Sequence, residues 1–272
     1  MDRMSPASEH ANDVVEVTNL VTHYGSRKIL DGVDMSVHKG EIMAIMGGSG
    51  SGKSTLLRHL LGLKKPTSGI VRVLGKDLAG ISSKDMYALR REMGVAFQGG
   101  ALFGSMSVGD NVSLPLREHT KLDENTIRIM ARIKLEIMNL AGFEDLMPSE
   151  LSGGMIKRAA LARAVIMDPK LLFFDEPSAG LDPVVAAELD DLILKLRNAL
   201  NISVVVVTHE LASAFKIADR ITMLDQGQVI FSGTVEDIRM SRNERVQDMI
   251  HRRPRSEELD TEAYLQRLTR NR

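Results

Sequence analysis

The segment Gly47–Thr55, which reads GGSGSGKST, constrains the fold of this chain more than any other stretch. It matches the pattern G-x-x-x-x-G-K-[ST], in which the backbone N–H groups of a glycine-rich loop wrap a polyphosphate. Such a loop lies between the end of a strand and the start of a helix, whose dipole adds positive charge. The apolar run before Gly47 and the leucines after Lys53 fit this unit. The sequence therefore predicts a phosphate-binding loop in an α/β sheet.

The same loop supplies most of the predicted nucleotide ligands. Its glycines allow backbone amides to approach phosphate oxygens without a clash at Cβ. Lys53 is expected to reach the phosphates and Ser54 to bind Mg²⁺. A Gly/Ser-rich connecting loop is the alternative, but it does not explain Lys-Ser-Thr at a helix start. The predicted nucleotide ligands in this loop are Gly47, Gly48, Ser49, Gly50, Ser51, Gly52, Lys53, Ser54 and Thr55.

A second predicted site element follows the apolar run Leu171–Phe174, where two carboxylates, Asp175 and Glu176, come in succession. Ligands of open α/β sheets bind at the carboxyl ends of the strands. Acidic residues after a strand are often only loop residues or helix caps, but here the chain also carries a phosphate loop. We therefore expect Asp175 to hold Mg²⁺ through water and Glu176 to polarise the water that attacks a phosphate.

Strands and helices alternate along most of the chain, which predicts a largely parallel sheet covered on both faces. A helical block from Gln98 to about Val165 interrupts this alternation and is interpreted as an inserted subdomain. The expected organisation is a flexible terminus at 1–12, a nucleotide-binding domain at 13–238 and an extension at 239–272. The expected strands are Val14–Leu20, Ile29–Val37, Glu41–Met46, Ile70–Leu74, Gly94–Phe97, Leu171–Phe174, Ser203–Thr208, Arg220–Leu224 and Val229–Phe231.

Composition limits the classes of function. A chain of 272 residues with 43% hydrophobic residues can bury a sizeable core. The formal net charge of −1 gives no sign of a nucleic-acid partner. The absence of cysteine excludes a disulfide scaffold, thiolate metal sites and a cysteine nucleophile. With no signal peptide and no apolar run of about 18 residues, we expect a cytosolic chain.

Taken together and in order, these motifs resemble the nucleotide-binding domains of ABC ATPases, over about residues 13–235. The resemblance implies an α/β P-loop NTPase fold with a RecA-like core, an N-terminal antiparallel β-subdomain and an inserted α-helical subdomain. It also implies ATP hydrolysis, with ATP and Mg²⁺ as cofactors. The segments that carry it are Gly47–Ser54, Gln98, Leu151–Gly154, Asp175–Glu176, Ser178–Asp182 and His209.

Single residues acquire roles through this resemblance. Tyr24 would stack on adenine, although a half-buried packing role is the alternative. Gln98 would join Mg²⁺ and the attacking water, and His209 would bridge the γ-phosphate to Glu176. A lone Gln or His at a strand end is more often structural, so both roles depend on placement beside the phosphate loop. The expected catalytic groups are Glu176, His209, Gln98 and Lys53, and the expected metal ligands are Ser54, Gln98 and Asp175.

The string Leu151–Gly154 would act on a second copy of the chain. The resemblance implies that Ser152, Gly153 and Gly154 contact the γ-phosphate of ATP held by the other protomer, and that Asp182 crosses the same interface. Taken alone, Leu-Ser-Gly-Gly could simply cap the following helix, and Asp182 could cap a helix before Pro183. Only one set of motifs is present. A homodimer sandwiching two ATP molecules is therefore expected.

A finer resemblance concerns the expected membrane partners. Phe97–Phe103, Pro115–Thr120 and Leu146–Glu150 closely match the ATPase subunits of Mla-type phospholipid transporters. Generic packing of the helical subdomain is the alternative reading. The resemblance implies an integral permease, a membrane-anchored substrate-binding subunit, a small STAS-domain regulator and a place on the cytoplasmic face of the inner membrane. An importer ATPase for a small polar solute and a soluble ABC ATPase for DNA repair or translation stay open.

The end of the chain lies beyond the part that these motifs explain. Residues 239–272 are rich in arginine and lack lysine, and Leu259, Tyr264 and Leu268 are spaced for a short helix with one apolar face. We expect an arm that docks on the other protomer or on the regulator. A solvated tail is the alternative.

Overall fold

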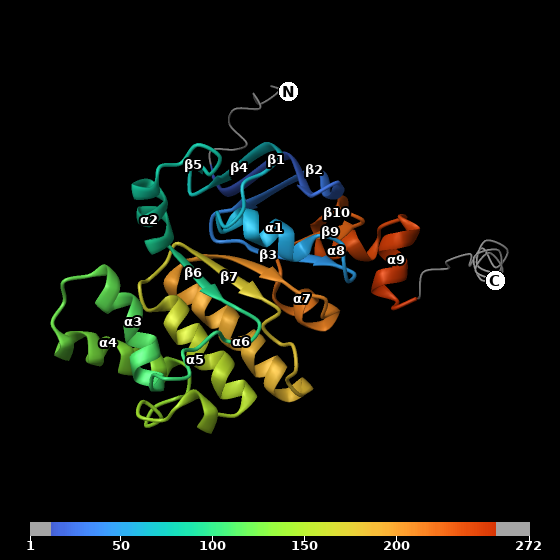
Figure 1. Cartoon of the computed structure of the whole chain (residues 1–272). Coiled ribbons are helices and arrows are strands. Elements are labelled where there is room, and N and C mark those ends of the chain that lie inside the picture. The colour runs from blue at the N-terminus through green and yellow to red at the C-terminus, as the bar shows by residue number, and fades with distance from the viewer. Residues whose placement is uncertain (1–11, 254–272) are drawn as a thin grey trace, which may run out of the picture.

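A computed structural model describes residues 12–253 (Figure 1). Its centre is a six-stranded sheet in the order β10-β9-β3-β8-β7-β6. All neighbours in this sheet pair in parallel except β10 with β9. The strands are β3 (Ile42–Gly47), β6 (Met93–Ala96), β7 (Leu171–Asp175), β8 (Ser203–Val207), β9 (Arg220–Asp225) and β10 (Gln228–Thr234).

A second, four-stranded antiparallel sheet in the order β2-β1-β4-β5 lies beside the first. Helix α1 (Lys53–Leu60) packs between the two sheets, because Leu56 and Leu60 are fully buried in a cluster with residues of both. The antiparallel strands are β1 (Asp13–Tyr24), β2 (Arg27–His38), β4 (Ser68–Val73) and β5 (Lys76–Asp77). This packing fixes the start of α1 directly after β3.

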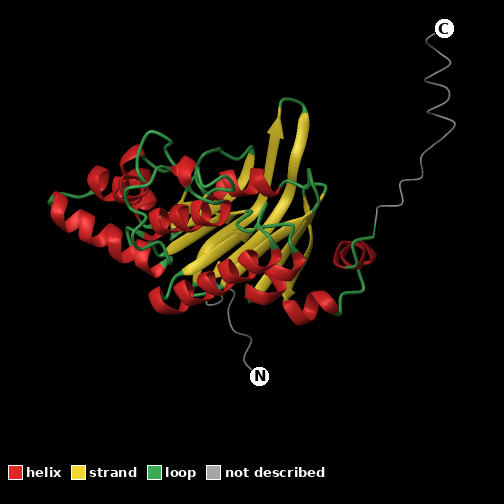
Figure 2. Ribbon diagram, turned by 90° about the horizontal axis from the view of Figure 1, so that it is seen from below, coloured by secondary structure: helices red, strands yellow, loops and turns green. Residues whose placement is uncertain are grey.

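The strands lie in the middle of the molecule with helices around them (Figure 2). Helices α3, α4 and α5 come between β6 and β7 in the sequence, and α3 contacts both α4 and α5 (Figure 1). The helices are α2 (Ser83–Arg91), α3 (Val108–His119), α4 (Glu124–Ile137), the 3₁₀ turn η1 (Pro148–Glu150), α5 (Gly153–Val165), α6 (Pro183–Leu200), α7 (Leu211–Ile217), α8 (Val235–Arg239) and α9 (Glu244–Ile250).

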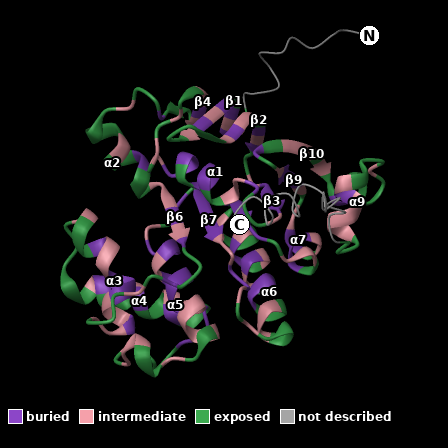
Figure 3. Cartoon of the chain, turned by 45° about the vertical axis from the view of Figure 1, so that its right-hand side comes forward, coloured by how far each residue is buried: buried purple, intermediate pink, exposed green. Residues whose placement is uncertain are grey.

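Strand β7 is buried on both faces, which explains its apolar run Leu171–Phe174. Leu171 and Phe173 belong to the core that α1 shares with the antiparallel sheet. Leu172 and Phe174 point the other way, into the core formed by α3 to α6. Successive side chains of a strand face opposite sides, so a strand buried on both faces needs an uninterrupted apolar run. The buried residues concentrate in this central region (Figure 3).

Most predicted elements are present with small changes at their ends. The predicted helical block from Gln98 to about Val165 contains three separate helices, α3, α4 and α5, and Asp123 caps α4 by accepting the N–H of Thr126. Helix α2, which Ser82 caps, was not predicted from the sequence. No helix within residues 12–253 combines the length and the apolar character needed to cross a bilayer.

The two chain ends are covered only in part. The expected flexible terminus at 1–12 lies outside the described residues, apart from Asn12. The structure describes the expected docking extension only as far as Arg253, just after α9. The predicted apolar face of Leu259, Tyr264 and Leu268 lies beyond that point, so the docking arm stays a prediction.

Candidate nucleotide-binding site

Four neighbouring parallel strands, β3, β8, β7 and β6, end at the same edge of the sheet (Figure 1). Gly47 and Asp175 are the last residues of β3 and β7, while Gln98 and His209 lie two residues after β6 and β8. The carboxyl ends of parallel strands form the usual ligand edge of such sheets. The structure therefore gathers at one place the groups that the sequence predicts for phosphate, metal and water.

The phosphate loop adopts backbone conformations that require glycine. Gly47 and Gly52 have φ angles of +149° and +109°. A Cβ on Gly47 would lie 2.3 Å from the carbonyl oxygen of Leu224, so a larger residue is excluded there. Gly52 precedes α1 without a side-chain cap, and the first turn of α1 holds no acidic residue. The first amides of α1 are thus left for an anion.

Two further groups in the loop fit a polyphosphate. The Ser51 hydroxyl oxygen is buried and has no hydrogen-bond partner, whereas buried polar groups are normally paired. Lys53 Nζ donates to the carbonyl oxygens of Gly47 at 2.8 Å and Gly48 at 3.1 Å. Burial lowers the pKa of Lys53, an effect that the charges of Glu176 and Asp175 oppose. An orphaned hydroxyl and a partly desolvated lysine suit phosphate oxygens.

The predicted metal ligands offer only oxygen atoms. Asp175 is half-buried, and burial, followed by the charge of Glu176, raises the pKa of Asp175. The hydroxyl of Ser54 and the amide of Gln98 are on exposed residues at the same sheet edge. Carboxylate, hydroxyl and amide oxygens are ligands that Mg²⁺ accepts, together with water and substrate phosphate. The donor set fits the predicted metal, whose ligands stay a prediction.

Glu176 is held by several contacts. Its φ is +50°, an uncommon conformation for a residue with a side chain. Its N–H donates to the carbonyl oxygen of Val207 at 2.8 Å. Its Oε2 accepts the backbone N–H of His209 at 3.3 Å and lies 2.8 Å from His209 Nδ1. The predicted pair of Glu176 and His209 is therefore in direct contact.

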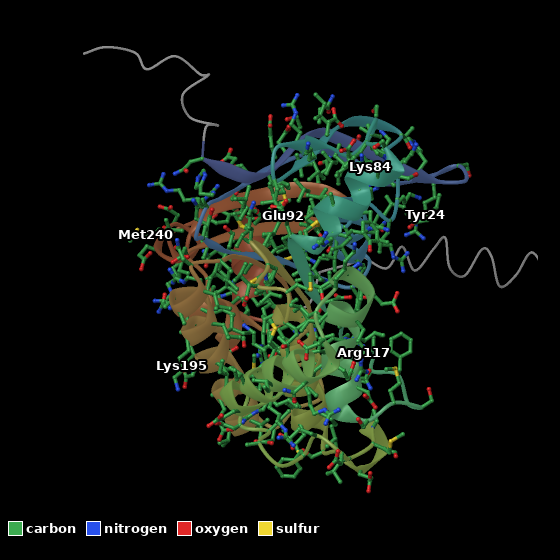
Figure 4. All side chains as sticks on the ribbon, turned by 90° about the vertical axis from the view of Figure 1, so that its left-hand side faces the viewer. Tyr24, Lys84, Glu92, Arg117, Lys195 and Met240 are labelled. Carbon is green, nitrogen blue, oxygen red and sulfur yellow. The ribbon has the colours of Figure 1, made fainter. Side chains whose placement is uncertain are left out.

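Tyr24 is the last residue of β1 and lies at the surface, 43% exposed (Figure 4). Arg58 donates to its hydroxyl at 3.3 Å, and Lys64 Nζ lies 3.3 Å from the centroid of its ring. One cation therefore contacts the hydroxyl of Tyr24 and another lies over its ring, and part of the side chain stays exposed to solvent. The sequence pattern did not identify Arg58 or Lys64, which are far from Tyr24 along the chain.

The segment Leu151–Gly154, here called the signature segment, contributes residues to a separate pocket. Ser152, Gly153, Gly154 and Asp182 line one pocket of about 390 Å³, and no residue of the phosphate loop lines it. Ser152 Oγ caps α5 by accepting the N–H of Met155 at 3.3 Å. Asp182 Oδ1 caps α6 by accepting two N–H groups, at 3.0 and 3.1 Å. Both capping alternatives therefore occur, and neither removes these residues from the pocket surface.

A groove of about 460 Å³ brings together two of the three stretches that carried the finer resemblance. Phe97, Phe103, Pro115 and His119 all line it, along with the arginines that end α2. Residues of Leu146–Glu150 are not among its lining. The hydroxyl of Tyr87 on α2 lies 2.6 Å from His119 Nδ1 on α3 and links the two helices beside the groove.

One residue of the site was missed by sequence reasoning. Lys157 Nζ donates to the carbonyl oxygens of Gln98 and Glu176, the latter at 3.2 Å. It lies on α5 one turn after Gly153 and therefore on the same helix face. The helical spacing alone predicts that Lys157 lies next to Gly153 on α5. Its contacts with Gln98 and Glu176 depend on the tertiary fold.

Comparisons with known proteins agree with this geometry. Residues 30–179 match the family described as "ABC transporter". The chain is 45% identical to the intermembrane phospholipid transport system ATP-binding protein MlaF of Haemophilus influenzae, covering 86% of this chain and 89% of that protein. It is also 41% identical to the probable ribonucleotide transport ATP-binding protein mkl of Mycobacterium leprae, covering 82% of this chain and 64% of that protein.

Solved structures with the same fold include a dimeric ATP-binding cassette, MJ0796, in a post-hydrolysis state bound to ADP and Pi. Its TM-score is 0.75 and its sequence identity 30%, over 81% of this chain and 98% of that one. CbiO1 of Clostridium perfringens, part of the transporter complex CbiONQ, gives a TM-score of 0.78 at 30% identity, over 94% of this chain and 99% of that one.

We predict that Lys53→Ala weakens ATP binding by about ten- to hundredfold, the range expected for losing a hydrogen bond from a charged group. The physical reason is that the phosphates lose a partly desolvated cation at the start of α1. Equilibrium binding of a fluorescent ATP analogue would measure the change. Affinity equal to that of the unchanged chain would contradict the placement of the phosphates in this loop.

We predict that Glu176→Gln slows ATP hydrolysis by about 10²–10⁴-fold, the usual range for losing a general base. Glutamine keeps the size of the side chain but cannot accept a proton from water. Single-turnover hydrolysis and nucleotide binding would be measured side by side, with binding expected to persist. If hydrolysis stayed at the original rate, Glu176 could not be the base.

Proposed function

The chain belongs to the ABC transporter family, and on that premise we propose that it powers phospholipid transport between the inner and outer membranes. It is the ATP-hydrolysing subunit of an ABC transporter, with the α/β fold that the motifs predicted. The likeness to MlaF carries the phospholipid proposal, because it extends over 86% of this chain and 89% of the relative.

We assign the proposed roles from the geometry of the sheet edge. The phosphate loop and Lys53 would bind the β- and γ-phosphates, while Ser54, Gln98 and Asp175 would hold Mg²⁺, which would neutralise phosphate charge. Glu176 Oε2 takes a proton from the attacking water. His209, whose Nδ1 lies 2.8 Å from that oxygen, orients the carboxylate and faces the γ-phosphate. Tyr24, exposed at the end of β1, stacks on adenine.

A second copy of the chain would complete each site. The pocket of Ser152, Gly153, Gly154 and Asp182 contains no phosphate-loop residue, which fits two halves of a site that are supplied by different chains. The α5 N-terminus, capped by Ser152, suits the γ-phosphate of ATP held by the partner. The cassette MJ0796, which resembles this chain, is described as a dimer with ADP and Pi. These observations support a head-to-tail homodimer.

The groove between α2 and α3 supports docking of an integral permease. Phe97 and Phe103 are 39% and 52% exposed there, which is unusual for aromatic side chains without a partner. We propose residues 13–238 as the nucleotide-binding unit and 98–165 as the helical subdomain that carries the groove. The substrate-binding subunit, the STAS-domain regulator and a position on the cytoplasmic face of the inner membrane rest on the likeness to MlaF.

A second candidate is the ATPase of an importer for a small polar solute. The 41% identity to the ribonucleotide transport protein mkl favours it, although this chain spans only 64% of that relative. The two candidates predict the same ATP chemistry. They differ in the substrate that stimulates hydrolysis by the assembled transporter.

We predict that phospholipid stimulates the ATPase of the complete transporter several-fold. The chain would be purified with its permease from native membranes and studied in phospholipid nanodiscs and in detergent without lipid. Steady-state ATPase rates would be measured with and without added ribonucleotides. Stimulation by ribonucleotides in place of phospholipid would favour the importer, and equal rates in nanodiscs and detergent would oppose the proposal.

We predict that Ser152→Arg lowers ATP turnover by about 10²–10³-fold, the range for removing one preorganised donor, while a single chain binds ATP as before. Its target phosphate lies on the other protomer. Ser82→Arg is the matched control, because Ser82 caps α2 in the same way, accepting the N–H of Asp85 at 3.1 Å. A loss of monomer affinity in Ser152→Arg would contradict the two-chain site.

A further inference from the structure

Lys157 is a second lysine at the candidate site, and unlike Lys53 it has no role in the proposed function. It lies on α5, which begins at the signature segment. Its Nζ donates to the carbonyl oxygens of Gln98 and Glu176. Helix α5 and strands β6 and β7 lie side by side (Figure 1). One side chain therefore joins the signature helix to the ends of two strands.

The contact with Glu176 falls on a residue whose backbone needs support. A φ of +50° is an uncommon and less stable backbone conformation for a residue with a side chain. The N–H of Glu176 is bonded to Val207 and its carboxylate contacts His209. The carbonyl oxygen of Glu176 accepts the N–H of Ala179 at 3.3 Å and, from α5, Lys157 Nζ at 3.2 Å. Lys157 is thus the contact that joins the backbone of Glu176 to α5.

A second residue of the same helix holds the segment after Gln98. Arg163 donates to the carbonyl oxygens of Gly100 and Ala101 at 2.9 and 2.8 Å. Lys157 and Arg163 together tie residues 98–101 to α5, so this segment and the helix would move as one body. Lys157 therefore contacts both Gln98 and Glu176, in addition to the pairing of β6 with β7 that brings these two residues together.

Lys157 is a cationic donor in a half-buried position, close to the carboxylates of Asp175 and Glu176. A charge-assisted hydrogen bond is roughly twice as strong as a neutral one. A neutral side chain of the same length could fill the space without holding the two carbonyl groups.

We propose that Lys157 is a positioning residue for ATP hydrolysis: it sets the backbone of Glu176 and Gln98 relative to the signature helix. This proposal rests on the proposed role of Glu176 as the base. Through Lys157, a movement of α5 on ATP-driven closure would reach the carboxylate that polarises the water. The residue acts on turnover and not on the binding of nucleotide by the phosphate loop.

The test compares Lys157→Met, which keeps the aliphatic stem, with Lys157→Arg, which keeps the charge and the donors. The full-length chain is used, with kcat and KM for ATP measured alongside thermal unfolding. Lys157→Met should lower kcat about ten- to hundredfold with KM within about threefold. Lys157→Arg should recover most of the loss. A kcat near the original value, or a loss confined to KM, would overturn the proposal.

Lys216→Met is the matched control for the loss of a lysine that braces the backbone. Lys216 Nζ donates to the carbonyl oxygen of Ala187 at 2.8 Å, pairs with Asp191 at 2.7 Å and so joins α7 to α6. It should change kcat less than about twofold, as expected for a substitution outside the site. An equal loss of kcat in Lys216→Met would mean that Lys157 only stabilises the fold, which would also overturn the proposal.

Combining Lys157→Met with Glu176→Gln separates this proposal from the proposed function. If Lys157 acts through Glu176, the double variant should be little slower than Glu176→Gln alone, because residues that act as a unit are not additive. If the full Lys157→Met loss persists on top of Glu176→Gln, the positioning role is wrong while the base assignment stands. If Glu176→Gln alone hydrolyses ATP normally, both are wrong.

Discussion

The parallel pairing of β3, β8, β7 and β6 is the constraint on which the candidate site depends. It brings the ends of four strands to one edge, so that segments far apart in the sequence meet there. Burial on both faces holds the pairing in register, because a shift by one residue would turn the side chains of β7 to the wrong core. The phosphate loop, the carboxylates and His209 are therefore placed by strands and not by flexible loops.

Two carboxylates, Asp175 and Glu176, and two lysines, Lys53 and Lys157, lie close together at this edge. Their partial burial shifts the pKa of three of these groups. Burial raises the pKa of Asp175 and lowers the pKa of both lysines. Lys53 is folded back on the carbonyl groups of its own loop. A polyphosphate with Mg²⁺ would bring both an anion for the lysine and a cation for the carboxylates, which makes the site suited to that pair.

The helical block links this edge to the rest of a transporter. Helix α3 contributes to the groove proposed for the permease, while α5 carries the signature segment at its start and Lys157 one turn later. Helix α3 packs on α5, so the groove and Lys157 lie on two helices in contact with each other. No residue of the phosphate loop lines the pocket of Ser152 and Asp182. In the proposed homodimer, a second chain would bring its phosphate loop to this pocket.

The sequence alone determined the features that are local in the chain. The phosphate loop, the carboxylates after β7, and the caps at Ser152 and Asp182 each depend on residues within a few positions, and periodicity located most helices and strands. Helix α2 was not predicted; it has nine residues, of which Leu89 is buried. The contacts of Lys157 with Glu176, Lys64 with Tyr24 and Tyr87 with His119 were decided only by the tertiary structure. They join elements through packing, and no spacing along the chain encodes which side chains will meet.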